Sequence, residues 1–218
     1  MKIALVTGVS SGIGKAIADE LTKNGYKVYG ISRKNGEIIC DLRDIKSLHV
    51  KIKEFLKTTD ISLLVNCAGV GVFAPHEEIS FEKINELIDV NLKAPILLTN
   101  LCLRSLKKTK GHIINIASVE ATKHSKFSAL YTATKSGLRD FSLSLFEELR
   151  RSGVKVTSIN PDMTQTAFFD KLNFKPSNEE NTHMKPKDIA KVLIQIVTSQ
   201  LVVTDITIRS QKLGIVKK

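Results

Sequence analysis

Two side chains with complementary chemistry, Tyr131 and Lys135, stand four residues apart. In a helix this spacing places both on one face, a turn apart. A free phenol has a pKa of about 10 and is a poor acid–base group at neutral pH, and a nearby ammonium group favours the phenolate and lowers that pKa. Such a tyrosine can pass a proton to a carbonyl oxygen while hydride reaches the carbon. Judged by this spacing alone, Tyr131 and Lys135 could instead be two neighbouring side chains on the surface of a helix, without a catalytic role.

A serine and a glycine-rich turn follow two other predicted strands. Ser118 comes after the apolar run 112–116 and can donate a hydrogen bond to the same carbonyl oxygen. The turn follows the run 3–6, and its glycines let backbone N–H groups and a helix N-terminus approach a pyrophosphate. We expect a dinucleotide at this turn, whose residues are Gly8, Ser10, Ser11, Gly12, Ile13 and Gly14. A purely structural turn is the alternative.

The elements that must position these residues alternate along the chain. Short apolar runs predict strands, and residues spaced three or four apart predict helices between them. The predicted strands cover residues 3–6, 27–31, 37–40, 61–65, 112–116, 154–159 and part of 201–208. This order predicts a Rossmann-like, doubly wound α/β fold, with a parallel sheet of about seven strands and helices on both faces. We expect one domain over 1–218, with a lid at about 162–185 where periodicity fails.

Five elements in one order resemble the short-chain dehydrogenase/reductase family. They are the TGxxxGIG turn at 7–14, Asn66-Cys67-Ala68-Gly69, Asn91 within a helix, Ser118 after a strand, and Tyr131-xxx-Lys135. The resemblance covers most of the chain, from Thr7 to about Asp162. It implies interconversion of a carbonyl and a secondary alcohol with a nicotinamide cofactor, with Tyr131 as the general acid and base.

The resemblance also implies roles for individual residues. Lys135 would bind the nicotinamide ribose, Asn91 would hold a water in a proton relay, and Asp41 would contact the adenine. Further cofactor contacts are implied for Leu42, Asn66, Ala68, Gly69, Tyr131, Pro161 and Thr164.

Residues after the second strand favour NADP(H) over NAD(H). An NAD site usually carries an acidic residue there, whereas this strand ends at Ser32 and Arg33. Arg33 can bind a 2′-phosphate through two charged hydrogen bonds, and Ser32 can add a hydroxyl donor. The alternative is that Arg33 only begins a solvated, charged loop. Glu37 lies close by in sequence and is the residue that could reverse the preference for NADP(H).

Three features depart from the family pattern. Only residues 34–36 separate the second and third strands, where the family usually has a helix. Cys67 replaces an asparagine, and we interpret it as a packing residue. Asp162 stands where glycine is usual, so either its side chain points outward or the loop follows a different path.

Pro95 lies inside a predicted long helix and is expected to kink it.

Partners and location follow from composition and the family pattern. Lys and Arg exceed Asp and Glu by 33 − 22, a net charge of +11. The basic residues are scattered, so we expect anionic ligands rather than nucleic acid.

Three separated cysteines and no apolar span predict a cytoplasmic protein without disulfide, metal or membrane contact. The family implies a homodimer or homotetramer, for which apolar positions such as Leu138 and Leu145 are available unless they cover the sheet.

The sequence does not select one class of substrate. Phe168, Phe169 and Phe174 in the lid suggest an apolar pocket, and Phe73 and Glu120 can contribute from other loops, but packing of the lid is an equal alternative. An NADP(H)-binding redox sensor with little catalysis is the alternative function. Loss of Tyr131 or Lys135 would mark such a sensor, and both are present.

Overall fold

The chain forms one parallel sheet with helices on both faces, in a computed structural model that describes residues 1–218. Neighbouring strands are hydrogen-bonded in the order β3-β2-β1-β4-β5-β6-β8, and every pair is parallel. The strands are β1 (Lys2–Thr7), β2 (Tyr26–Ser32), β3 (Ile38–Ile39), β4 (Leu63–Asn66), β5 (His112–Ile116), β6 (Lys155–Pro161) and β8 (Asp205–Ile208). The predicted doubly wound fold is therefore confirmed. No helix has both the length and the apolar character to cross a membrane.

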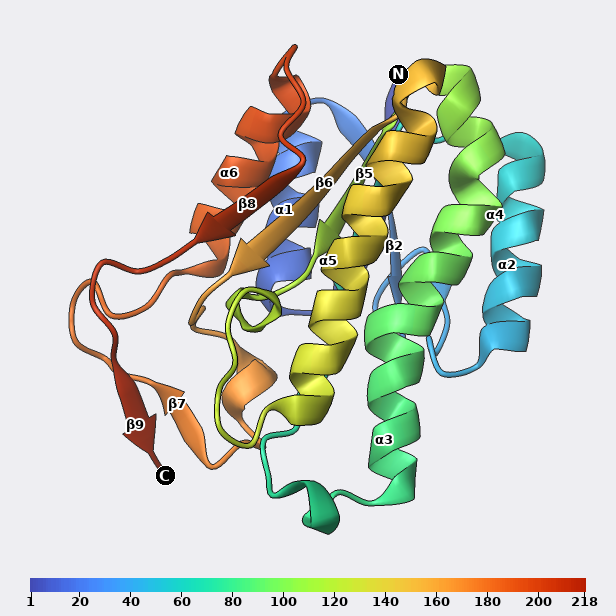
Figure 1. Cartoon of the computed structure of the whole chain (residues 1–218). Helices are drawn as coiled ribbons and strands as arrows, with labels where there is room; N and C mark the ends of the chain where they lie inside the picture. The colour runs from blue at the N-terminus through green and yellow to red at the C-terminus, as the bar shows by residue number, and fades with distance from the viewer.

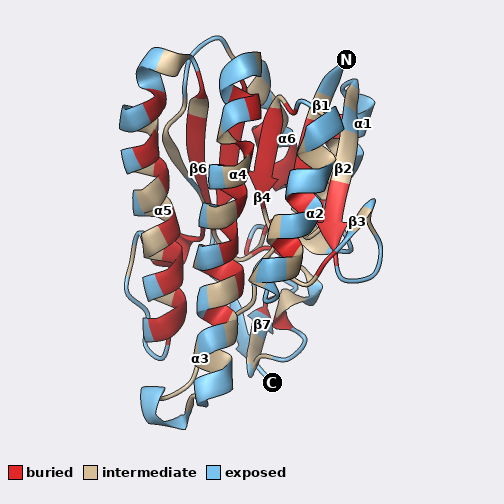
Figure 2. Cartoon of the chain, turned by 90° about the vertical axis from the view of Figure 1, so that its right-hand side faces the viewer, coloured by how far each residue is buried: buried red, intermediate tan, exposed pale blue.

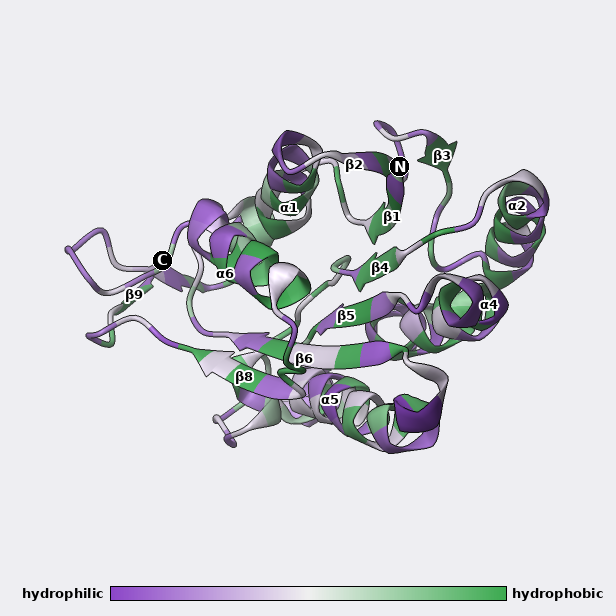
Figure 3. Ribbon diagram, turned by 90° about the horizontal axis from the view of Figure 1, so that it is seen from above, coloured by the Kyte–Doolittle hydropathy of each residue, from purple (hydrophilic) through white to green (hydrophobic).

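Helices cover the two faces of the sheet unequally (Figure 3). Helices α1 (Gly12–Lys23) and α6 (Pro186–Thr198) pack on one face, and α2 (Ile45–Thr58), α4 (Ala94–Thr109) and α5 (Ala129–Leu149) pack on the other. Each face has its own apolar core, because a strand alternates its side chains between the two faces. Strands β4 and β5 are buried at every residue, and Figure 2 shows β4 in red among the helices.

Helix α5 uses its apolar positions to cover the sheet. Leu138 and Leu149 are each 1% exposed, and Leu145 is also buried in the core that α5 shares with β5 and β6. Of the two roles expected for these residues, packing on the sheet is the one the structure shows. They are not available to form a subunit interface.

The long helix predicted after residue 81 is interrupted just before Pro95. Helix α3 (Phe81–Ile88) passes into a π-helical turn, Asp89–Lys93, and then into α4. Pro95 lies in the first turn of α4, directly after the π-helical turn. The regular hydrogen-bond pattern of the helix is therefore broken beside Pro95, and the irregular turn holds Asn91, which is fully buried. Such single π-turns often occur at functional sites.

The crossover between β2 and β3 contains no helix, as predicted from its length. Five residues, 33–37, connect these strands. The carboxylate of Glu37 accepts a hydrogen bond from the backbone N–H of Gly30 at 2.6 Å. Glu37 is therefore bound to the backbone of β2.

The segment 162–185, which the sequence predicts to be a lid, pairs with residues near the C-terminus, and the sequence patterns did not predict this pairing. Strand β7 (Phe174–Pro176) pairs antiparallel with β9 (Ile215–Lys217). The Lys218 ammonium donates to the carbonyl oxygens of Phe169 and Asp170 at 2.6 and 2.9 Å. In Figure 1 this small sheet lies beyond the arrowheads of β6 and β8, at the carboxyl end of the parallel strands.

Candidate active site

Tyr131 and Lys135 lie in the first half of α5 and are almost completely buried. Tyr131 is 7% exposed and Lys135 is 4% exposed. The Lys135 ammonium donates to the carbonyl oxygen of Ile116 at 2.8 Å and lies 5.9 Å from the centre of the Tyr131 ring. Because Ile116 is the last residue of β5, this bond fixes the lysine at the carboxyl end of the sheet. The structure thus excludes the surface-pair alternative for these two residues.

Ser118 follows β5 and begins the 3-10 helix Val119–Ala121. It is buried, and its hydroxyl oxygen accepts a hydrogen bond from the N–H of Glu120 at 3.2 Å. The Ser118 side chain also acts on the ionisation of the Tyr131 phenol, which places the two hydroxyl groups in one site. The hydroxyl proton of Ser118 is not used by this backbone bond.

The ionisation of Tyr131 differs from the expected direction. Burial raises the pKa of Tyr131 to about 12, the Ser118 hydroxyl lowers it, and the charge of Glu120 raises it further. Burial also lowers the pKa of Lys135 to about 8. Loss of water disfavours the phenolate, and this effect outweighs the hydrogen bond from Ser118. The expected lowering of the Tyr131 pKa by Lys135 is therefore wrong for the protein alone, and the phenol is protonated at neutral pH.

Asn91 is held by the backbone of the loop after β4. Its side-chain oxygen accepts from Val70 N at 2.9 Å, and its side-chain nitrogen donates to Val70 O at 2.8 Å and to the Thr134 hydroxyl at 3.2 Å. A Cβ atom added to Gly69 would lie 3.4 Å from the Lys135 nitrogen and 3.5 Å from the Asn91 oxygen. The four residues predicted to be catalytic thus gather around the ends of β4 and β5.

Hydrogen bonds to Thr7, the last residue of β1, fix the segment Asn66-Cys67-Ala68-Gly69. The Thr7 hydroxyl oxygen accepts from the N–H groups of Cys67 and Ala68, both at 2.9 Å. Asn66 is buried within the sheet, and its amide donates to the Asn115 side chain at 2.8 Å, so it supports the loop from β4. Burial raises the pKa of Cys67 to about 12, in agreement with a packing role.

The glycine turn has the geometry that the dinucleotide interpretation requires. Gly8 and Gly12 have φ angles of 77° and 57°, which strongly favour glycine. A Cβ atom at Gly14 would lie 2.3 Å from the Gly8 carbonyl oxygen, so only glycine lets α1 approach β1 this closely. Ser11, which precedes α1, makes no side-chain bond to the first N–H groups of the helix. Ser10 and Ile13 complete this turn at the N-terminus of α1.

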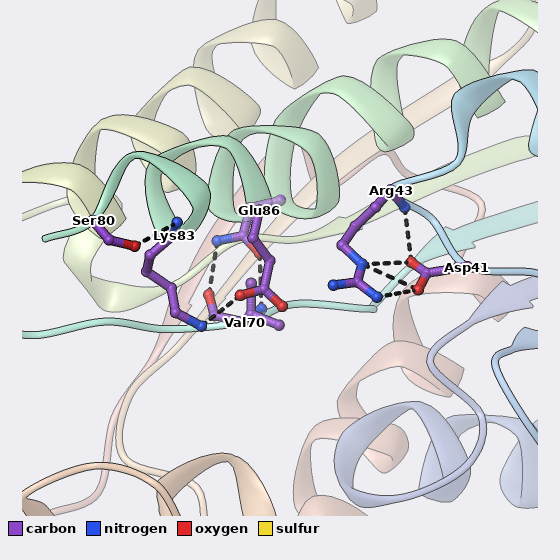
Figure 4. Close-up of polar contacts among 7 residues, drawn as sticks. Asp41, Arg43, Val70, Ser80, Lys83 and Glu86 are labelled. Carbon is purple, nitrogen blue, oxygen red and sulfur yellow. Dashed lines mark hydrogen bonds and ion pairs between the residues drawn. The ribbon is translucent and has the colours of Figure 1, made fainter.

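Polar groups follow both β2 and β3, and those after β3 form an ion pair. Arg33 is exposed, while the Ser32 hydroxyl oxygen accepts from Asn35 N at 2.9 Å. Arg43 binds both carboxylate oxygens of Asp41, with its closest contact at 2.6 Å (Figure 4). This pair holds the pKa of Asp41 below its usual value, and the sequence patterns did not predict it. Leu42 beside it is buried in the core.

The loop after β6 connects the sheet to the lid. Pro161 ends β6, and Asp162 accepts a hydrogen bond from the N–H of Met163 at 2.9 Å. The Thr164 hydroxyl donates to the Asp162 carbonyl oxygen at 3.0 Å and is buried. The Asp162 carboxylate therefore caps its own turn, which explains how an acidic residue is accommodated at this position.

Aromatic side chains from the lid and from the loop after β4 surround Tyr131. The Phe73 and Phe168 rings lie 5.2 and 5.9 Å from the Tyr131 ring. Phe174 packs at 5.0 Å on Phe73, and Phe169 packs at 5.2 Å on Phe168. The predicted apolar residues of the lid therefore cover the phenol and exclude water from it.

The fold and this arrangement define a nicotinamide-dinucleotide-binding α/β protein, and comparison with known proteins agrees. A family model described as short chain dehydrogenase matches residues 2–177. An uncharacterized oxidoreductase of Staphylococcus epidermidis is 34% identical over 226 residues, covering 95% of this chain and 96% of its own. One of Staphylococcus saprophyticus is 33% identical over 230 residues, covering 95% and 97%.

Solved structures show the same similarity. The alcohol dehydrogenase of the archaeon Thermococcus sibiricus, complexed with 5-hydroxy-NADP, has a TM-score of 0.86 and 26% identity and covers 97% of each chain. A metagenomic short-chain oxidoreductase in complex with NADP has a TM-score of 0.80 and 30% identity over 97% of each chain. The chain belongs to the short-chain dehydrogenase family of oxidoreductases.

Proposed function

We propose that the protein interconverts a carbonyl compound and a secondary alcohol with NADP(H), using Tyr131 as the general acid and base. The observation that carries this proposal is the burial of Tyr131 and Lys135 together, with Ser118 at the same end of the sheet. When bound, the cofactor supplies or accepts the hydride. The residues present fit it, since the glycine turn, Arg33 and Lys135 offer donors to its phosphates and ribose.

The proton steps belong to this chain's own residues. In the reducing direction, the Tyr131 hydroxyl, protonated because of its raised pKa, donates its proton to the carbonyl oxygen. The Ser118 hydroxyl donates a hydrogen bond to the same oxygen and stabilises its developing negative charge. The Lys135 ammonium stabilises the resulting phenolate and orients the ribose. Asn91 fixes the loop after β4 through its two hydrogen bonds to the Val70 backbone.

Preference for NADP(H) over NAD(H) is proposed from Arg33. Its guanidinium is exposed at the end of β2, with no carboxylate bound to it, and Glu37 is engaged by Gly30 instead. Both structural relatives described above hold NADP or a derivative of it. By contrast, a 4-hydroxyisoleucine dehydrogenase with a TM-score of 0.83 and 25% identity was solved with NADH. The choice must therefore be measured on this protein.

The deciding experiment is a panel of aldehydes and ketones tested with NADPH and NADH. We expect turnover with NADPH, and about 10-fold or greater loss of NADPH affinity in Arg33→Ala with little change for NADH. Lys34→Ala, which removes the neighbouring charge, is the control and should change NADPH affinity far less. A protein that binds NADPH tightly but reduces no carbonyl would contradict the proposed catalysis and support a redox sensor.

A homodimer or homotetramer in the cytoplasm is proposed from family membership. Phe81 on α3 is 73% exposed, and Ile88 and Ile96 near the π-turn are 39% and 38% exposed. These side chains lie on the helices that follow the catalytic loop of β4. Light scattering at several protein concentrations would test the assembly, and a monomer at all of them would contradict it.

A further inference from the structure

A buried carboxylate, Glu120, lies beside the proposed catalytic residues and has no part in the steps above. It occupies the 3-10 helix that follows Ser118 and is 8% exposed. Transfer of a carboxylate from water into a protein interior is unfavourable unless charged or hydrogen-bonding partners compensate. The partners of Glu120 therefore show what holds it there.

The two oxygens of this carboxylate have different surroundings. Oε1 accepts a hydrogen bond from the Ser125 hydroxyl at 2.8 Å and lies 3.4 Å from the Lys123 ammonium. Oε2 is equally buried and has no hydrogen-bond partner in the protein. Buried polar atoms are nearly always paired, so an unpaired oxygen near an active site calls for a partner outside the chain.

Glu120 lies close to the proposed acid–base residues. Its backbone N–H bonds to the Ser118 hydroxyl oxygen, and its charge acts on the Tyr131 phenol. The same phenol is lined by the Phe73 and Phe168 rings. The Tyr131 phenol is therefore surrounded by apolar rings and lies near a carboxylate that has one unpaired oxygen.

We propose that Glu120 Oε2 accepts a hydrogen bond from a hydroxyl group of the substrate, which is then a ketone or aldehyde carrying a hydroxyl group near its carbonyl. This inference rests on the proposed function. A neutral hydroxyl fits better than an ammonium group, because Lys123 already offsets the charge of Glu120 and Lys135 is a second cation beside the phenol. An aromatic hydroxyketone satisfies both the rings and the acceptor.

The test compares acetophenone with 2-hydroxyacetophenone, in wild type and in Glu120→Gln. Because the hydroxyl group also changes the reactivity of the carbonyl, the informative quantity is the change in the ratio of the two kcat/KM values. The Gln amide can keep the Ser125 contact through its oxygen and present NH₂ in place of Oε2. We expect the ratio to fall by about 10-fold or more, as for a lost hydrogen bond to a charged group.

Two controls and a binding measurement accompany this ratio. Lys123→Gln removes the ion pair and keeps Oε2, so its ratio should stay within about 5-fold of wild type. Glu120→Asp retracts the carboxylate and should lower the ratio, which provides a second variant if Glu120→Gln does not fold. Calorimetry with NADP⁺-loaded Tyr131→Phe protein, in which the alcohol is not oxidised, should show tighter binding of 1-phenyl-1,2-ethanediol than of 1-phenylethanol, and this difference should be lost when Glu120→Gln is added.

Three results would overturn the inference. Equal losses on both ketones in Glu120→Gln would mean that the residue only shapes the Ser118 turn. No preference for the hydroxyketone or the diol in wild type would remove the proposed contact. A stronger, Glu120-dependent preference for 2-aminoacetophenone would mean a cationic substrate instead. Each leaves the proposed function intact, whereas failure of the wild type on every carbonyl with NADPH overturns that function itself.

Discussion

Helix α5 and the lid meet at Tyr131 but are supported differently. Helix α5 packs Leu138 and Leu149 into the core and is tied to the sheet by the Lys135–Ile116 bond. The lid is joined to the body by irregular loops and by β7, whose partner β9 is exposed at all three residues. A site whose reacting groups lie on regular elements and whose cover lies on loops can keep one chemistry while its substrate changes.

The largest expected effect comes from removing the phenol hydroxyl on the rigid side. Tyr131→Phe should lower kcat/KM by ~10²–10⁴-fold because it removes the proton donor, while NADPH affinity should change little. Stopped-flow turnover and NADPH fluorescence titration measure the two quantities. Tyr29→Phe, in which the ring packs on Phe55 away from the site, is the matched control and should retain activity. Full activity of Tyr131→Phe would show that the acid–base assignment is wrong.

A second substitution tests the close approach of α1 to β1. Gly14→Ala would place a methyl group 2.3 Å from the Gly8 carbonyl oxygen, so the glycine turn must open. We expect NADPH affinity to fall by about 10- to 100-fold, in line with overpacking of a tight site. Gly137→Ala on α5, where the nearest atoms of Leu92 lie at 3.4 Å, is the control. Unchanged affinity in Gly14→Ala would argue against pyrophosphate binding at this turn.

The ionisation of Lys135 predicts a smaller, pH-dependent effect. Its pKa of about 8 means that the ammonium loses its proton as pH rises through that value. If the charged form binds the cofactor, NADPH affinity should be constant below pH 7 and fall above pH 8, by up to about 10-fold per pH unit. Titrations from pH 6.5 to 9.5 measure this, and Lys135→Met should abolish the slope. A flat wild-type profile would contradict the assigned role of the lysine.

The smallest effect is expected from loosening the lid. Deleting residues 213–218 removes β9 and the two bonds of Lys218 to the carbonyls of the lid. We expect the KM for the carbonyl substrate to rise by roughly 3- to 10-fold, since lid ordering contributes to substrate binding, while NADPH affinity stays the same. Lys218→Met should give a smaller change of the same sign. A change in cofactor affinity instead would mean that lid and glycine turn are not separable, a possibility raised by the contact of Thr166 with Gly12.

Much of this site could be predicted because local sequence patterns carry it. Strand runs such as 3–6 and 112–116 are apolar because both faces of a parallel sheet are buried. The spacing of Tyr131 and Lys135 determines that they share a helix face in any helix. The glycines at 8, 12 and 14 mark the turn because other residues would be strained or would clash there.

Contacts between distant segments could not be predicted from those patterns. The ends of β7 and β9 are about forty residues apart in sequence, and β9 has no buried face to mark it. The Asp41–Arg43 pair depends on how one loop turns, and the raised pKa of Tyr131 depends on rings supplied by other segments. Local spacing says nothing about how much water these rings remove from the phenol.

The sequence by itself thus determined the order of strands and helices and the fold class, and it selected the residues proposed for the reacting centre, because each depends on spacing along a single element. Only the tertiary structure decided that burial raises the pKa of Tyr131, that Asn91 is bound to Val70, and that Glu120 keeps one oxygen without a partner. These depend on which side chains from separate elements meet in space and on how much solvent they displace.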